Sequence, residues 1–273
     1  MIKSNKIRLF WWNEVKIQNK SKENYGDLLG AYLVEKISKK EVVWVRPKDF
    51  SILNHFQPIY ATIGSILTHV NKKCVVWGSG IISKDYPIKK AKFLAVRGPQ
   101  TRQFLVNQGY EVPKVYGDPA LLLPDYFFPK VSKKYKIGVV PHYDDYAVVK
   151  KWFLSENNIV VLDLMTNNVE ETTIRFLECE AIVSSSLHGI IVAHAYGIPA
   201  VWQRFSDKLF GDDIKFQDYF ESVQIQPYTP EIINKELTYA QLEELLKSPN
   251  TLPKPEVITE IKTGLMEVCP FKE

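Results

Sequence analysis

Short apolar runs alternate with stretches of helical periodicity along most of the chain. In the first half, runs rich in β-branched and aromatic residues predict strands at 7–12, 41–45, 59–62, 74–77 and 92–96. Leucine and isoleucine recur on one face of 28–38, which predicts a helix capped by Asp27. Pro99 and Gly109 bracket a second predicted helix, 100–107. Strands that alternate with helices indicate an α/β protein with parallel sheets.

The second half repeats this alternation. It predicts strands at 137–140, 159–163, 181–184 and 200–202, and helices at 172–179, 190–196, 239–246 and 255–266. Periodicity lapses in the proline- and lysine-rich segment 124–136, the predicted hinge. We therefore expect an N-terminal lobe at 1–128, a C-terminal lobe at 129–254, and a C-terminal helix in 255–273 able to pack back on the first lobe. A central cleft would then lie between the carboxyl ends of the two sheets.

Composition narrows the class of protein. With 273 residues, 45% hydrophobic and 24% charged, the chain can bury a core. The net charge of +4 is spread too thinly for a nucleic-acid footprint but suits anionic small substrates, or a loose approach to an anionic membrane surface. No run reaches the ~18 apolar residues of a membrane span, and the three cysteines are widely spaced. We expect a cytoplasmic protein without a metal site or bound cofactor.

One candidate anion site lies in residues 93–104, FLAVRGPQTRQF. Arg97 follows a predicted strand and precedes a predicted helix, beside free backbone N–H groups and the positive end of a helix dipole. A guanidinium group binds carboxylate or phosphate with two hydrogen bonds. The local sequence fits equally well a surface arginine at a turn.

A candidate proton donor lies in residues 184–189, SSSLHG, between a buried strand and a helix. His188 falls at the turn, where Gly189 permits close approach of a ligand. Histidine suits proton transfer near neutral pH, although a histidine that only hydrogen-bonds the loop fits the local pattern too. His194, inside the apolar helix, is expected to be a hydrogen-bonded core residue.

Further loops carry weaker signals. The glycine loops at 63–66 and 77–81 follow strands, but Ser83 breaks a dinucleotide fingerprint, so nicotinamide binding is not expected. Asn24 and Asp27 lie in a polar turn that also reads as a plain helix cap. The segment 206–220 mixes aspartates with aromatics, which fits a structured loop or sugar platform at least as well as a metal site.

Taken together, eight segments resemble the polysaccharide pyruvyl transferase family. They are NYGDLLGAYL (24–33), GSIL (64–67), VVWGSGI (75–81), AVRGPQTRQFL (95–105), YGDPALLLP (116–124), IGVVPHYDD (137–145), SSSLHGIIVAHAYGIPAVW (184–202) and SDKLFGDDIKFQDYF (206–220). The resemblance implies a glycosyltransferase-B-like fold of two Rossmann-like lobes. It also implies phosphoenolpyruvate as donor and a sugar, often lipid-linked, as acceptor, as in exopolysaccharide or capsular polysaccharide biosynthesis.

The resemblance also implies site residues. Relatives place an arginine at Arg97 and a histidine at His188 in the donor site; some place another arginine where this chain has Ser186, which leaves a second anion clamp unassigned. The expected catalytic residue is His188, as general acid. The expected donor-binding residues are Arg97, Gly78, Ser79, Gly80, Ser186, Leu187 and Gly189. The expected acceptor side comprises Asn24, Asp27 and His142, with Asp118 as a turn former that could also face the acceptor.

The acceptor could be linked to undecaprenyl diphosphate, with the enzyme at the inner face of the membrane. The sequence leaves the oligomeric state, the acceptor sugar and the bridged hydroxyls open. Two other functions remain: a nucleotide-sugar glycosyltransferase on the same fold, and a sugar-binding protein with a decayed site.

Overall fold

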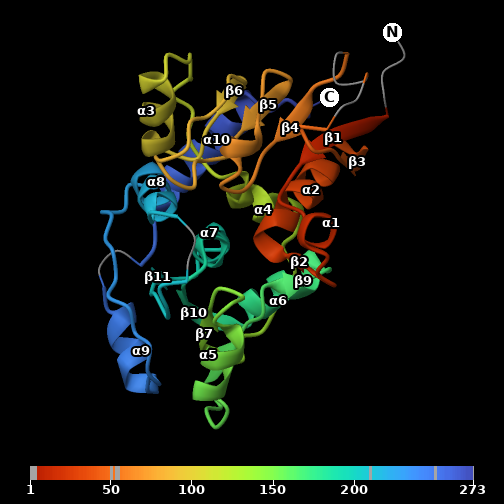
Figure 1. Cartoon of the computed structure of the whole chain (residues 1–273). Helices are drawn as coiled ribbons and strands as arrows, with labels where there is room; N and C mark the ends of the chain where they lie inside the picture. Colours follow the sequence, from red (N-terminus) through yellow and green to blue (C-terminus); the bar gives the residue numbers. More distant parts are fainter. Residues whose placement is uncertain (1–4, 50–51, 53–55, 209–210, 249–250, 273) are drawn as a thin grey trace.

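Two parallel sheets, one from each half of the sequence, organise the chain (Figure 1). The computed structural model describes residues 5–49, 52, 56–208, 211–248 and 251–272. The first sheet has five strands in the order β3-β1-β4-β5-β6, all parallel to their neighbours. Its strands are β1 (Lys6–Phe10), β3 (Glu41–Trp44), β4 (Ile59–Ala61), β5 (Cys74–Trp77) and β6 (Lys92–Ala95).

The second sheet has four parallel strands in the order β11-β10-β7-β8. They are β7 (Tyr135–Val140), β8 (Ile159–Val161), β10 (Cys179–Ser184) and β11 (Ala200–Trp202). These two sheets confirm the predicted α/β class and are consistent with two Rossmann-like lobes of a glycosyltransferase-B-like fold. A short antiparallel pair joins the two halves of the chain, because β2 (Glu23–Asn24) pairs with β9 (Met165–Thr166).

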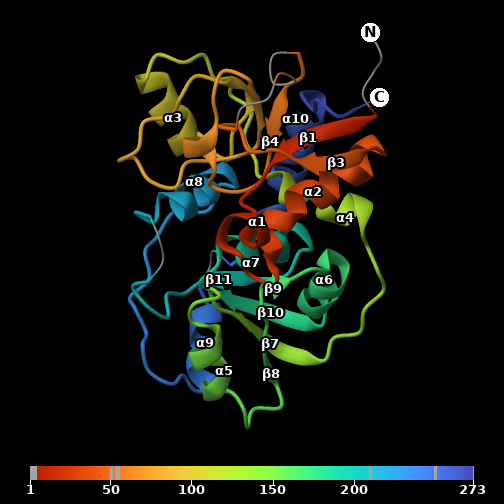
Figure 2. The same ribbon diagram turned by 45° about the vertical axis from the view of Figure 1, so that its right-hand side comes forward.

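Helices surround and separate the sheets (Figures 1 and 2). They are α1 (Glu14–Gln18), α2 (Tyr25–Ser38), α3 (Pro99–Asn107), α4 (Leu123–Tyr126), α5 (Tyr146–Trp152), α6 (Val169–Leu177), α7 (Leu187–Ala195), α8 (Ile214–Ser222), α9 (Tyr239–Leu246) and α10 (Pro255–Glu267), with 3₁₀ turns η2 (Leu67–His69) and η3 (Pro119–Leu122). Thr238 and Gln241 form the predicted capping box at the start of α9. Of the helices that the structure describes, none is both long and apolar enough to cross a membrane.

Three predicted helix starts were wrong. α2 begins at Tyr25 because the Asn24 side chain accepts from the Gly26 N–H, so Asn24 is the cap and Asp27 lies inside the first turn. α6 begins at Val169, capped by Asn168, and Cys179 belongs to β10. α7 begins at Leu187, which places His188 in its first turn rather than in the preceding loop.

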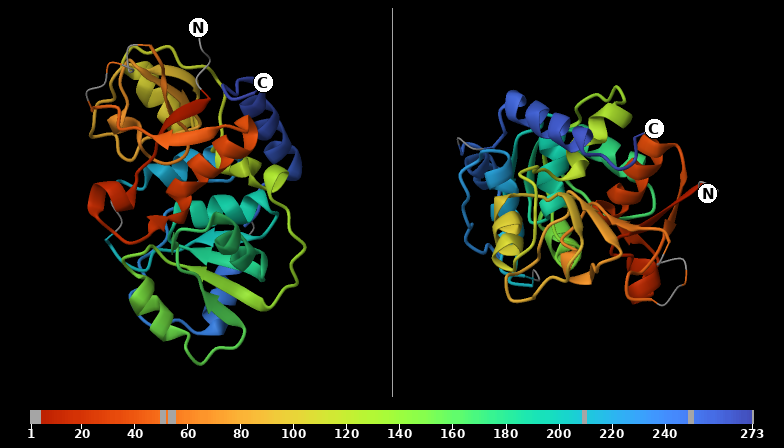
Figure 3. Two further views of the ribbon diagram at one scale, coloured as in Figure 1. Left: turned by 90° about the vertical axis from the view of Figure 1, so that its right-hand side faces the viewer. Right: turned by 90° about the horizontal axis from the view of Figure 1, so that it is seen from above.

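The two halves of the chain share one hydrophobic core. Its buried residues come from both lobes, among them Leu29 and Trp77 from the first and Ile190 and Trp202 from the second. α10 returns to the first sheet (Figure 3), where the Trp77 indole N–H donates to the Leu265 carbonyl at 2.9 Å. Continuous packing across the junction fixes how the loops of the two sheets face each other.

Candidate functional site

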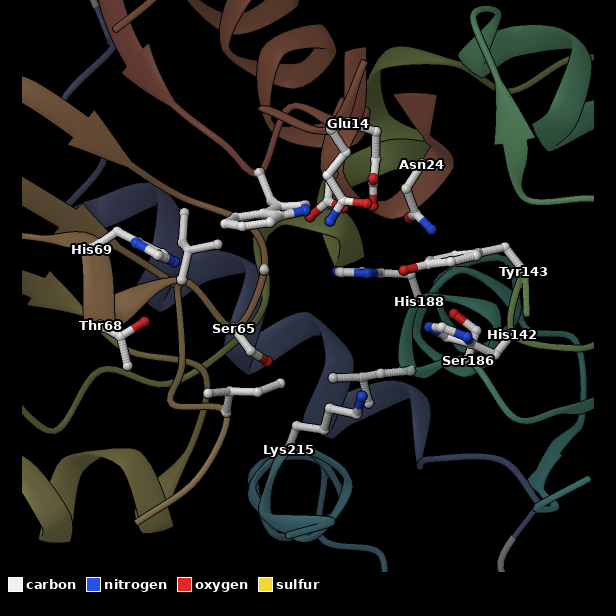
Figure 4. Close-up of a pocket in the computed structure, with 17 residues that line it drawn as sticks. Glu14, Asn24, Ser65, Thr68, His69, His142, Tyr143, Ser186, His188 and Lys215 are labelled. Carbon is white, nitrogen blue, oxygen red and sulfur yellow. The ribbon is translucent and has the colours of Figure 1, made fainter. Parts of the chain in front are cut away.

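A cavity of about 450 Å³ lies between the lobes, at the carboxyl ends of the strands (Figure 4). Loops after β1, β4, β5, β7 and β10 all contribute, which is where parallel α/β sheets bind ligands. The lining residues are Trp12, Glu14, Gln18, Asn24, Asp27, Gly64, Ser65, Ile66, Thr68, His69, Ile82, His142, Tyr143, Ser186, Leu187, His188 and Lys215.

His188 projects into this cavity from the first turn of α7 (Figure 4). Its Nε2 faces the Asp118 Oδ2 atom at 3.6 Å, inside the protein. Asp118 is fully buried, and its other oxygen accepts from the Ala120 N–H at the start of η3. Among the residues that the structure describes, neither Nε2 nor Oδ2 has a hydrogen-bond partner. Asp118 can therefore orient the imidazole ring.

Glycines in the motifs make room for the site side chains. A Cβ atom on Gly26 would lie 2.1 Å from the His188 Nδ1 atom, and one on Gly80 would lie 2.4 Å from the Arg97 Cζ atom. A Cβ on Gly98 would lie 1.9 Å from the Asp218 carbonyl oxygen. These contacts are far shorter than van der Waals separations, so glycine is required where helix α2 meets His188 and where Arg97 is enclosed.

Arg97 is fully buried behind the cavity wall. Its Nε donates to Asp218 at 3.1 Å, one terminal nitrogen donates to the Ser65 hydroxyl at 2.7 Å, and the other donates to the Ile81 carbonyl at 2.8 Å. Asp218 also accepts from the Thr101 backbone N–H and hydroxyl. Arg97 thus meets the cavity through Ser65, which lines it, and does not line it directly.

Five described groups in the cavity wall have shifted pKa values, and burial is the largest cause for each: it lowers the pKa of His69 and raises that of Tyr143, and it acts on Asp27, Lys215 and His142 as follows. Burial raises the pKa of Asp27 to about 7. The negative charges of Glu14 and Glu23 also raise this pKa, whereas the positive charges of His188 and Lys215 lower it. Burial lowers the pKa of Lys215 to about 8. The positive charge of Arg97 lowers this pKa further, whereas the carboxylates of Asp213 and Asp27 raise it. Burial, and then Lys215, lower the pKa of His142. Asp27 and Lys215 can therefore exchange a proton near neutral pH.

A family model described as polysaccharide pyruvyl transferase matches residues 24–202. This chain belongs to that family. It is accordingly a transferase that acts in polysaccharide modification. The chain is also similar to the uncharacterized protein L143 of Acanthamoeba polyphaga mimivirus, with 36% identity over 211 residues, which cover 74% of this chain and 72% of the relative.

The interlobe cavity gathers part of the predicted site. His188, Ser186 and Leu187 line it, as do all three residues expected on the acceptor side: Asn24, Asp27 and His142. The other predicted donor residues lie outside the lining. Arg97 and Ser79 are fully buried, Gly78 packs on Pro119, Gly80 packs on Arg97, and Gly189 packs on Ser184. The Ser79 hydroxyl donates to the Gly64 carbonyl, so it shapes the loop that carries Ser65.

Sequence reasoning missed Lys215 as a site residue. It belongs to α8, which was read as a structured loop or sugar platform. The available signal was the apolar spacing of Ile214, Phe216 and Phe220, which predicts a helix with one buried face. Glu14 of α1 and His69 of η2 also line the cavity, from two short elements that were not predicted. Trp12, at the end of the predicted strand 7–12, lines it from the loop after β1, and Tyr143 lines it from the loop after β7.

Other chemical candidates have structural partners. His194 is buried, with Nδ1 at 2.9 Å from the Tyr219 hydroxyl and Nε2 at 3.1 Å from the Thr251 carbonyl, and burial lowers its pKa to about 4. The prediction of a hydrogen-bonded core histidine is confirmed. Asp212 accepts from the Lys84 N–H and Asp213 lies 3.4 Å from Arg204. Within the described ranges, no three His, Cys, Asp or Glu residues gather as a metal-binding group.

Proposed function

We propose that this family member transfers a pyruvyl group from phosphoenolpyruvate to a sugar, releasing phosphate and forming a cyclic ketal. One observation carries the proposal. In a member of this family, a single interlobe cavity is lined by an imidazole backed by a buried carboxylate, a cation and a second carboxylate whose pKa is near neutral. These groups meet the needs of a reaction that moves protons and binds an anionic donor.

In the proposed reaction, protonated His188 donates its proton to the methylene carbon of the donor. The central carbon becomes cationic, and one sugar hydroxyl adds to it. Phosphate then leaves, and attack by a second hydroxyl closes the ketal ring. Each of the two sugar hydroxyls loses one proton. The methylene carbon gains one proton when it becomes a methyl group, and the phosphate leaves with one as hydrogenphosphate, so the protons balance.

Several residues support these steps without all touching the donor. Asp118 faces the His188 Nε2 atom at 3.6 Å and holds the imidazole ring in place for the first step. Arg97 holds Ser65 against the cavity and adds positive charge behind it. Asn24 and His142 line the wall toward the acceptor, and Trp12 and Tyr143 add aromatic surfaces of the kind on which sugar rings pack.

Mass spectrometry of the reaction products tests the proposal. The protein is incubated with phosphoenolpyruvate and a panel of nitrophenyl glycosides and undecaprenyl-diphosphate-linked sugars, the second set representing the acceptor that we favour. We expect one acceptor to gain a single pyruvate ketal with matching phosphate release. A thermal shift caused by a nucleotide sugar and none caused by phosphoenolpyruvate would contradict the proposal.

Asp27 is proposed as the base that accepts the proton of the attacking hydroxyl. Because its pKa is raised to about 7, the carboxylate is present above that pH and is lost as pH falls through it. We expect kcat/KM to fall as pH drops below about 7, and Asp27→Asn to lower kcat by about 10²–10⁴-fold. Initial rates of phosphate release, measured across a range of pH for the wild type and for Asp27→Asn, give the pH dependence of kcat/KM and the change in kcat.

Exposed Asp207 provides the matched control, since Asp207→Asn makes the same chemical change outside the cavity. The donor phosphate has its own ionisation near pH 6, which remains in every variant. A rate for Asp27→Asn equal to that of Asp207→Asn would rule out the role of base.

A further inference from the structure

The cavity needs a cation that reaches the donor, and the turn before α7 does not provide one. Ser186 lines the wall there with a neutral hydroxyl. Arg97 lies behind the wall, with Nε and both terminal nitrogens engaged by Asp218, Ser65 and Ile81. Among the described residues that line the cavity, Lys215 is the only lysine or arginine.

Helix α8 holds Lys215 against the cavity. The residues on either side of it, Ile214 and Phe216, are buried, and the Phe216 ring stacks on Trp202 with centroids 4.0 Å apart and planes at 6°. One turn further on, Asp218 is fixed by Arg97 and Thr101. With both sides of the helix anchored, the Lys215 side chain crosses the cavity floor toward Ser65 and His188 (Figure 4).

Among the described residues, the ammonium group of Lys215 has no ion-pair partner. Within the part of the chain that the structure describes, no carboxylate forms an ion pair with it, since the nearby Asp213 pairs with Arg204 at 3.4 Å. The charged groups around it are Asp27 from α2, Arg97 after β6, Asp213 before α8, and His142 after β7. A half-buried cation beside a second, fully buried cation gains most from an anionic ligand.

We propose that Lys215 binds the anionic donor directly and is the second anion clamp of this site. This inference rests on the proposed function, because it takes phosphoenolpyruvate as the ligand. The charge-assisted contact replaces water around the ammonium group with a phosphate or carboxylate oxygen. The donor would then lie between α7 and α8, with His188 on one side and Lys215 on the other.

Calorimetric titration with phosphoenolpyruvate tests the proposal on the full chain. A hydrogen bond to a charged group contributes about 1.5–3 kcal/mol, so Lys215→Ala should weaken binding by about 10–100-fold. Lys215→Arg should restore most of the affinity. Exposed Lys208 supplies the matched control, because Lys208→Ala removes the same charge outside the cavity and should bind as the wild type does.

The pH dependence gives a second readout that a merely structural role would not produce. Because the pKa of Lys215 is lowered to about 8, its charge is lost as pH rises through that value. Wild-type affinity should therefore fall between about pH 8 and about pH 9.5, while arginine remains charged and Lys215→Arg should show no such fall. In this range Asp27 is mostly ionised and His142 is neutral, so neither produces the loss.

The outcomes separate this inference from the proposed function. If the wild type binds the donor and a folded Lys215→Ala variant binds it equally well, the role of Lys215 is wrong and the function stands. If the wild type does not bind phosphoenolpyruvate, the proposed function fails and the inference fails with it. Should Lys215→Ala melt at a lower temperature than Lys208→Ala, Lys215→Met replaces it in the titration, with the same outcomes applied.

Discussion

Replacing His188 with alanine is expected to lower the rate of pyruvyl transfer by about 10²–10⁴-fold, the usual contribution of a general acid. The side chain is 12% exposed, and that exposure is to the cavity, so its removal should leave the fold intact. Among the described residues of α7, His188 is the only histidine that lines the cavity. The other histidine of this helix, His194, forms hydrogen bonds inside the core. Phosphate release in the presence of acceptor measures the effect.

His194→Ala is the matched control for that experiment. His194 lies on the same helix but hydrogen-bonds the Tyr219 hydroxyl and the Thr251 carbonyl, so its loss should reduce stability and leave the rate per folded molecule near that of the wild type. Equal losses of rate in the two variants, each corrected for its folded fraction, would mean that His188 is not the proton donor.

Replacing Asp218 with alanine should destabilise the protein by about 3–5 kcal/mol, the usual cost of breaking a buried ion pair on one side. Both Asp218 and Arg97 have no exposed side-chain surface. Without Asp218, the Arg97 guanidinium and the Thr101 N–H at the start of α3 lose their acceptor. Urea unfolding at neutral pH measures the difference in free energy.

The double variant Arg97→Met with Asp218→Leu distinguishes charge from packing. Because it removes both buried charges, it should recover much of the stability that Asp218→Ala loses. It should still transfer pyruvyl groups poorly, since Ser65 loses the donor that holds it against the cavity. A loss below about 1 kcal/mol in Asp218→Ala would show that the pair is not desolvated in solution.

The sequence predicts the sheets better than the site, for physical reasons. Strand 74–77 and helix 239–246 have the predicted bounds because apolar runs and capping residues act locally. The start of α2 was misplaced because Asn24 and Asp27 are both good caps, and only the chain's path decides between them. His188 was found because a strand–turn–helix pattern puts it at a carboxyl edge.

The rest of the site depends on contacts between distant segments. The Asp118–His188 pair joins residues 70 positions apart in the numbering, and the Arg97–Asp218 pair joins residues 121 positions apart. A sequence motif identifies Arg97 as a cation at a helix start but cannot reveal that Asp218 will enclose it. Lys215 was missed for the same reason, since its place on the cavity floor follows from the packing of α8 on Trp202.

A crystal structure with phosphoenolpyruvate bound is the most direct test of this account. We expect the donor in the interlobe cavity between α7 and α8, with its methylene carbon against the His188 ring and an oxygen within hydrogen-bond distance of the Lys215 ammonium group. A donor that binds outside this cavity, or inside it with His188 and Lys215 both out of reach, would contradict the account.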